Sequence, residues 1–450
     1  MGFPRHFLFA PRIDEELRKH YGNRTKVSAA TRMLPMYRFP DLFRAADALG
    51  SDYKIIHQIT SRHEEPLDSI LSTSGGAHYN RKLNLAGSNP RQVDYDETEY
   101  FPEESFWIIL HQETQQKYIL RARNVYQMTF IEVVSSSNEL AQSFLDTVIT
   151  LANEHSVYRN KVFEIRFEPS GQEYGTDHEQ AFQVHFLKRH GIDDDEIILE
   201  DEVRSLIERN VIDFHRRRDQ LVELGVPRKR GLLLYGPPGN GKTYTCKYLA
   251  GCLEDATTIF AAGTALVQIR TIFNVARLFQ PSLIVLEDID LVYSDRQINP
   301  YSPQLGSLMD ELDGAADADN LIVMLTTNSI ERVESAIKDR PGRVSQCIEI
   351  PNPGPKLRRL YLKSLLREFQ DDQLDYNELV TLTDGASHAF IKEFVYRSIQ
   401  IASERANSDG QFDLLNEDFQ TSQHEMTQQG GKAGRSIIGF RATSSTNSTQ

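Results

Sequence analysis

The stretch GLLLYGPPGNGKT, residues 231–243, decides the fold predicted for this chain. Leu232–Tyr235 is a short apolar run of the kind that forms a buried strand, and a glycine-rich turn ending in Lys-Thr follows it directly. Glycines let the backbone wrap a phosphate chain so that successive N–H groups face its oxygens, and a helix that starts there adds its positive end. The stretch therefore predicts a phosphate-binding loop, with a glycine-rich turn of no special function as the alternative.

The predicted loop assigns a nucleotide-binding role to nine consecutive residues: Gly236, Pro237, Pro238, Gly239, Asn240, Gly241, Lys242, Thr243 and Tyr244. Lys242 is expected to reach the β and γ phosphates, and the Thr243 hydroxyl to hold Mg²⁺. The cofactors predicted from this loop are ATP and Mg²⁺.

A second apolar run ends in two carboxylates, in SLIVLEDIDL at residues 282–291. Ligands bind at the carboxyl ends of strands in α/β sheets, so Glu287 and Asp288 are expected beside the phosphates. Nucleotide hydrolases commonly end this strand in Asp-Glu. Exchanging the two residues changes the length of each acidic side chain by only one methylene. We assign Glu287 to magnesium and Asp288 to the attacking water. Two exposed turn acids are the alternative.

Two further motifs complete the predicted site. LIVMLTTN places Asn328 at the end of a third apolar strand, where its amide is expected to contact the γ-phosphate or the water. DRPGR then carries Arg340 and Arg343, and a guanidinium suits the charge that develops on a transferred phosphoryl group. We expect these arginines to act as fingers on a neighbouring subunit, which requires a ring. Two surface arginines on a loop are the alternative.

Apolar runs alternate with helical segments after about residue 197, which predicts an α/β fold with a parallel sheet flanked by helices. Composition shifts at DDDEIILEDEV and PNPGP set the other boundaries. The expected domains are a small N-terminal α+β domain, a connector helix, a large α/β subdomain, a helical lid and a disordered tail, at residues 1–196, 197–225, 226–353, 354–425 and 426–450.

The N-terminal domain has no motif for chemistry. FWIIL, KYILRAR and TFIEVV predict strands, and an apolar stripe from Leu140 to Ala152 predicts a helix. Before residue 105 the pattern is weak, apart from helix-like stretches at Asp14–Tyr21 and Asp41–Leu49.

Composition is that of an ordinary globular protein, with 40% hydrophobic and 25% charged residues among 450. The formal net charge of −14 argues against a general affinity for nucleic acid. Three cysteines without a CxxC pair indicate a reducing compartment. No uncharged run is long enough to span a bilayer, so we expect a cytoplasmic protein without a membrane segment.

With these elements in order, residues from about 197 to 425 resemble an AAA+ ATPase. ELDGAADADNLIVMLTTN and DRPGRVSQCIEIPNPGP are similar to the second region of homology of that family, and TDGASHAFIKEFV is similar to its lid helix. Within the family, LEDID and RPGRV most resemble the Bcs-type branch, that of the mitochondrial Rieske-protein translocase and its soluble bacterial relatives. That branch itself carries Glu-Asp at the strand end.

The resemblance implies a ring, expected to be a hexamer, that converts ATP hydrolysis into movement and acts on a protein client through its N-terminal domain. Peptide-threading members carry an aromatic-Gly pore loop after the second strand, and FAAGTALVQIRTIF has no such insertion. The alternatives are a nucleotide-dependent interaction switch with little turnover and a DNA-associated ATPase. The sequence leaves open the client and the role of GRSIIGF near the C-terminus.

Overall fold

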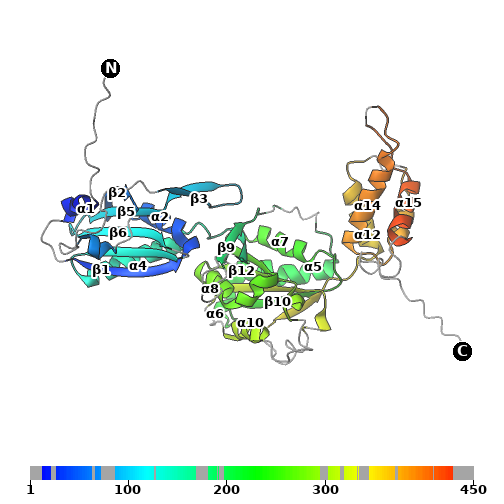
Figure 1. The fold of residues 1–450 in the computed structure, drawn as a ribbon. Coiled ribbons are helices and arrows are strands. Elements are labelled where there is room, and N and C mark those ends of the chain that lie inside the picture. Colours follow the sequence, from blue (N-terminus) through cyan, green and yellow to red (C-terminus); the bar gives the residue numbers. More distant parts are fainter. Residues whose placement is uncertain are drawn as a thin grey trace, which may run out of the picture. The chain divides into compact units, whose positions relative to one another are not determined.

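The computed structural model describes residues 13–21, 27–62, 66–71, 87–125, 128–168, 181–189, 191, 197–293, 303–314, 319–331, 333, 344–369, 373–408 and 410–428. Contacts divide the chain into two compact units, Met1–Lys188 and Arg189–Gln450. Figure 1 shows the helices and strands of each.

The first unit is built on an antiparallel sheet. Its strands, in spatial order, are β1 (Ser28–Pro35), β7 (Met128–Ser135), β6 (Lys117–Val125), β5 (Glu104–His111) and β2 (Tyr53–Thr60). Its helices are α1 (Ile13–Tyr21), the short 3₁₀ helix η1 (Met36–Arg38), α2 (Phe39–Asp47), α3 (Leu67–Leu71) and α4 (Asn138–Glu154). Strand β3 (Ser88–Gln92) pairs antiparallel with β4 (Thr98–Pro102). Strand β8 (Val162–Glu168) likewise pairs antiparallel with β9 (Ala181–Phe186).

Helices cover both faces of this sheet, and strand β5 accordingly carries a continuous apolar run at residues 106–110. Successive side chains of a strand point to opposite faces. Phe106 therefore packs with Leu17 and Leu67 from α1 and α3. Trp107 packs on the other face against Phe43 of α2, with ring centroids 5.0 Å apart. The sheet is the middle layer of this unit.

A buried ion cluster ties three strands of the first unit together. The Arg121 guanidinium, with no exposed surface, donates from Nε to Glu104 Oε1 at 2.7 Å and from Nη1 to Glu132 Oε2 at 2.9 Å. The other oxygen of Glu132 accepts from the backbone N–H of Leu67 at 3.0 Å. Buried charges are tolerated only when they are paired and hydrogen-bonded, which these contacts achieve.

The second unit is built on a parallel sheet. Its strands, in spatial order, are β14 (Gln346–Glu349), β10 (Arg230–Tyr235), β13 (Leu321–Thr327), β12 (Ser282–Glu287) and β11 (Thr257–Ala262). Helices before and between these strands are α5 (Asp201–Glu208), the π-helical turn η3 (Arg209–Asp213), α6 (Phe214–Glu223), α7 (Lys242–Cys252), η4 (Gly263–Gln268), α8 (Ile269–Leu278), α9 (Ile289–Tyr293) and α10 (Pro303–Gly314).

Four helices follow the sheet and form a helical subdomain. They are α12 (Pro355–Leu366), α13 (Tyr376–Leu382), α14 (His388–Ser403) and α15 (Asn416–Gln428). Their core packs Phe390, Phe394 and Phe419 with aliphatic side chains from all four helices. This subdomain corresponds in sequence to the predicted lid.

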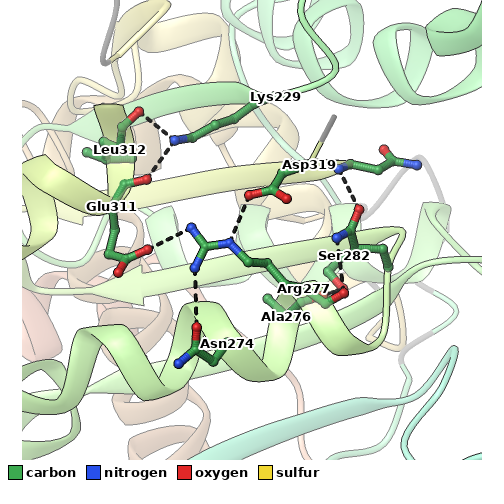
Figure 2. A network of polar contacts seen from close by, with 10 residues as sticks. Lys229, Asn274, Ala276, Arg277, Ser282, Glu311, Leu312 and Asp319 are labelled. Carbon is green, nitrogen blue, oxygen red and sulfur yellow. Dashed lines mark hydrogen bonds and ion pairs between the residues drawn. The ribbon is translucent and has the colours of Figure 1, made fainter. Parts of the chain in front are cut away.

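A polar network lies at the end of the parallel sheet where β12 and β13 begin, and Figure 2 shows it. Arg277 of α8 donates to Glu311 Oε2 at 2.7 Å and to Asp319 Oδ2 at 2.8 Å. Lys229 Nζ donates to the carbonyl oxygens of Glu311, at 2.7 Å, and of Leu312. These carbonyls belong to the last turn of α10, where cations are favoured by the helix dipole. The network fixes α10 to α8 and to the start of β10.

Arg189 satisfies backbone groups at the end of α7. Its guanidinium donates to the carbonyl oxygens of Leu253 at 2.9 Å and Ala256 at 3.1 Å, and also to that of Ala250. The last carbonyls of a helix have no partner within the helix, so this contact caps α7.

The structure confirms the predicted fold class of an α/β sheet with flanking helices, preceded by a region with an antiparallel sheet. The strands predicted at FWIIL, KYILRAR and TFIEVV lie in β5, β6 and β7, and the predicted apolar helix is α4. Strands β1 to β4 were not predicted. The expected domain boundaries stay predictions; the one near residue 196 and the tail beyond 428 lie outside the described residues. Among the helices that are described, none has the length and apolarity to cross a bilayer.

The position of Lys229 generates a pH prediction. Burial, helped by Arg277, lowers the pKa of Lys229 to about 8, while Asp319 and Glu311 act to raise it. The pKa of a lysine in the unfolded chain is about 10.4. Between about pH 8 and pH 10 the unfolded chain therefore binds a proton that the folded chain has released. Stability contributed by this residue should therefore rise with pH in that window.

The measurement compares thermal midpoints of the wild-type protein and the Lys229→Met variant at about pH 7.5 and about pH 9.5. The wild-type advantage should grow at the higher pH. Lys356→Met, at a lysine whose side chain is 80% exposed, serves as the control and should show no such trend. A difference between wild type and Lys229→Met that does not change with pH would contradict this account.

Candidate functional site

The loop after β10 is shaped by glycines that no other residue could replace. Gly236 has φ +145°, and a Cβ there would lie 2.2 Å from the Ile350 carbonyl oxygen. Gly239 has φ +80°, and its Cβ would lie 2.8 Å from the Ala389 side chain. Because contacts below 3 Å do not occur, the loop can lie against the end of β14 and the start of α14 only if both positions lack a side chain.

Asn240 attaches this loop to the helical subdomain. Its side chain is 1% exposed, donates to Asn352 Oδ1 at 2.8 Å and accepts from the His388 backbone N–H at 3.4 Å. Gly239 adds a direct bond, since its carbonyl accepts from Ala389 N at 2.9 Å. Asn240 was predicted to bind nucleotide; its side-chain contacts join the loop to α14.

Lys242 lies inside the loop at the first position of α7, with 6% of its surface exposed. Its Nζ donates to the carbonyl oxygens of Gly236 at 2.8 Å and Pro237 at 3.0 Å. Burial lowers the pKa of Lys242, and the carboxylates of Asp288 and Asp290 oppose this shift. The ammonium group is thus held where a phosphate chain wrapped by the loop would meet it. Thr243 follows with an exposed side chain.

The backbone at Asp288 explains the order of the two carboxylates. Asp288 has φ +49°, in the left-handed region, and its N–H donates to Thr326 Oγ1 at 3.0 Å. Asp and Asn are the non-glycine residues that adopt this conformation most readily, because a short polar side chain avoids the steric cost. Glu at this position would be strained. The Glu-Asp order therefore fits the turn that ends β12.

Asp288 and Asn328 are brought together across two neighbouring strands. Asn328 Nδ2 donates to Asp288 Oδ1 at 2.9 Å. Glu287 lies on the other side of the strand, near enough to α7 that its charge adds to burial in raising the pKa of the Cys246 thiol. Both carboxylates are therefore at the carboxyl end of β12, as predicted.

A hollow of about 970 Å³ joins these groups. Its lining includes the phosphate loop, Asp288 and Asn328, together with Ile198 and residues of α12 and α14. His388 lies in it with its ring 5.1 Å from that of Tyr361. Burial lowers the pKa of His388 to about 4, although the Ile198 backbone acts to raise it, so the imidazole is neutral at pH 7. A neutral imidazole and an aromatic ring beside an anion-binding loop suit contact with a nucleotide base.

These residues fit ATP with Mg²⁺. Mg²⁺ is usually held by one or two carboxylates plus substrate phosphates and water, not by a full protein cage. Among the described residues, no group of three or more His, Cys, Asp or Glu is arranged to hold a metal. Thr243 and Glu287 stay the predicted metal-facing residues. Arg340 and Arg343 lie outside the described residues, so their role also stays a prediction.

Sequence analysis missed three residues that shape the site. Asp290 accepts from the ends of β13, Asn352 links the loop to Gly385 through a 2.7 Å bond, and Thr326 holds the Asp288 N–H. Asp290 stands in the same acidic run as Asp288, which could have identified it. The partners of Asn352 and Thr326 lie far from them in the sequence, and no sequence signal indicated them.

The fold and this site are those of a P-loop nucleotide-binding domain. The phosphate loop follows β10, the amide of Asn328 follows the neighbouring strand β13, and the carboxylates lie at the end of β12. Comparison with known families is more specific. Residues 232–352 match the family described as ATPase family associated with various cellular activities (AAA). This stretch of the chain is an AAA ATPase domain.

Curated relatives share this part of the chain. Proteasome-activating nucleotidase 1 of Haloferax volcanii is 32% identical over 207 residues, which is 42% of this chain and 50% of that protein. Proteasome-activating nucleotidase of Aeropyrum pernix is 33% identical over 216 residues, covering 44% and 51%. A 26S proteasome regulatory subunit 8 homolog of Naegleria fowleri is 30% identical over 212 residues, covering 43% and 50%. The chain spans about half the length of the curated relatives it matches.

These relatives agree with the AAA+ resemblance and do not support its narrower form. They are proteasome-activating nucleotidases and a proteasome regulatory subunit homolog, and none is of the Bcs type.

The left-handed backbone of Asp288 generates a stability prediction. Asp288→Glu should lower the free energy of unfolding by about 1 kcal/mol, the cost of the left-handed region for an ordinary side chain. Asp288→Asn should stay within about 0.5 kcal/mol of wild type because Asn tolerates this conformation. Denaturant unfolding of the three proteins measures both values. Equal stability of the Glu and Asn variants would show that the turn imposes no such constraint.

Proposed function

We propose that the protein is a ring-forming ATPase that uses Mg²⁺-dependent ATP hydrolysis to remodel a protein client. The observation that carries this proposal is the meeting of Lys242, Asp288 and Asn328 in one hollow. They come from the ends of three neighbouring parallel strands. A buried cation, a carboxylate and a neutral amide are the groups that phosphoryl transfer to water requires.

In the proposed reaction Lys242 exchanges the carbonyls of Gly236 and Pro237 for the β and γ phosphates of ATP. Thr243 and Glu287 would hold Mg²⁺, which when bound neutralises phosphate charge and polarises the phosphoryl oxygens. Asp288 orients the attacking water and accepts its proton.

Asn328 is proposed to alternate between two partners. Its amide holds the Asp288 carboxylate through a 2.9 Å bond. A γ-phosphate in the hollow would compete for the same N–H donors, and this exchange would free Asp288 for water. The amide thereby makes the position of the base depend on which nucleotide is bound.

Movement of the helical subdomain is proposed to follow from its bonds to the loop. Asn240 and Gly239 contact the first residues of α14 directly. A change of the loop on nucleotide binding therefore acts on α14 through short hydrogen bonds.

The ring, which we take to be a hexamer, is supported by the relatives and by the expected arginine fingers, Arg340 and Arg343. The client is proposed to bind the N-terminal unit. Since the sequence lacks an aromatic-Gly insertion after Phe260, we favour remodelling by domain movement over threading. The net charge of −14 disfavours nucleic acid as the partner. Membership of the Bcs-type branch and a cytoplasmic location stay predictions.

The second candidate is a nucleotide-dependent switch with little turnover. It is favoured by one observation, the bond that engages Asp288 with Asn328. If this bond persists with ATP bound, the carboxylate is not available to the water. Steady-state turnover at saturating ATP and Mg²⁺ separates the two candidates.

Two substitutions at the site test ATP turnover. Lys242→Ala should abolish phosphate release because the γ-phosphate loses its buried cation. Asp288→Asn should lower kcat by at least about a hundredfold while still binding ATP, because a general base contributes on that order. Phosphate release and fluorescent-nucleotide binding measure the two effects. Undiminished phosphate release in both variants would refute the proposed hydrolysis.

Mixing of wild-type and variant subunits tests the proposed ring. Arg340→Ala subunits should inactivate wild-type subunits on mixing, because the finger acts on a neighbouring site. The ATPase rate measured across mixing ratios should fall below the simple average of the two proteins. Arg62→Ala, at a 70% exposed arginine of the first unit, is the control. A fully active monomer in sedimentation analysis would contradict the ring.

A further inference from the structure

Asp290 is a buried carboxylate at the site to which no role has been given. It lies in the first turn of α9, two residues after Asp288, and is 4% exposed. Its Oδ1 accepts from Thr327 Oγ1 at 2.7 Å and from the backbone N–H of Asn328 at 3.1 Å. A buried carboxylate is costly unless it is hydrogen-bonded, and here both donors come from the end of β13.

These bonds fix the residue that carries the site amide. Asn328 is held at its backbone by Asp290 and at its side chain by Asp288. Thr327 strengthens the arrangement, since its hydroxyl also accepts from Ser329 N at 3.0 Å. After β12, the backbone N–H of Leu291 in α9 donates to the Asp288 carbonyl at 3.0 Å and holds the turn that joins Asp288 to Asp290. The ends of β12 and β13 therefore share one hydrogen-bonded frame.

We propose that Asp290 is a positioning residue for hydrolysis, which holds Asn328 so that its amide meets Asp288 and can pass to the γ-phosphate. This inference rests on the roles proposed above for Asp288 and Asn328. Asp290 is not among the residues that line the hollow in the described part of the chain, so it acts through Asn328 and does not touch ATP. It should therefore affect kcat far more than nucleotide affinity.

A double-mutant cycle tests this role in the full-length protein, using Asp290→Ala, Asn328→Ala and the combined variant. Asp290→Ala alone should lower kcat by at least about tenfold, with the affinity for a fluorescent ATP analogue within about threefold of wild type. In the Asn328→Ala background the same change should lower kcat by less than about twofold, because residues that act as a unit are not additive.

The conservative variant separates geometry from charge. Asp290→Asn keeps the oxygen that accepts from Thr327 and Asn328 but removes the negative charge near Lys242. It should keep kcat within about threefold of wild type if the hydrogen bonds are what matters. A loss as large as that of Asp290→Ala would overturn the proposal in favour of a charge effect on Lys242.

Two further outcomes are decisive. An equal loss in wild-type and Asn328→Ala backgrounds would overturn the proposal, because Asp290 would then act independently of Asn328. If Asp290→Ala does not fold, Thr327→Val takes its place in the cycle; it removes one of the two donors and should lower kcat only when Asn328 is present. Failure of the proposed function is distinguishable, because turnover would then be absent from the wild-type protein or would be unchanged by Lys242→Ala.

Discussion

The parallel pairing of β10, β12 and β13 is the constraint on which the site depends. Tyr235 lies opposite Thr327 in the register, so the phosphate loop and the segment carrying Asn328 leave the sheet at the same level. Leu286 pairs with Leu325, which brings Asp288 to that level as well. Three short apolar strands thus set the relative positions of a cation, a carboxylate and an amide that are far apart in the sequence.

Buried polar groups, not apolar packing alone, fix the ends of these elements. Arg277 and Lys229 form hydrogen bonds at the amino-terminal ends of the strands. Asn240 and Asp290 form hydrogen bonds at the carboxyl ends. Each of these groups is hydrogen-bonded, and such bonds have strict distances and directions. Apolar contacts would keep the layers together but would allow small shifts. Directional bonds at the strand ends restrict the geometry where chemistry requires accuracy.

Sequence could predict the features that are local. The glycines, Lys242 and the strands before Glu287 and Asn328 are read from adjacent residues, and the apolar run of β5 follows from burial on both faces. Other features depend on pairing across long separations. Strand β2 is exposed along most of its length, so it lacks the alternation that marks a half-buried strand. The left-handed turn at Asp288 and the bond from Asn240 to Asn352 likewise have no signature in neighbouring residues.

Arg189 and the phosphate loop hold α7 at its two ends. The loop fixes the first turn against α14, and the guanidinium fixes the last turn through the carbonyl oxygens of Ala250 and of the C-cap residue Leu253. Helices lose order first by fraying at their termini, and both termini of α7 are restrained. An axial displacement at the first residue is therefore carried as a rigid rod over about 16 Å, the length of this helix, without being absorbed by unwinding.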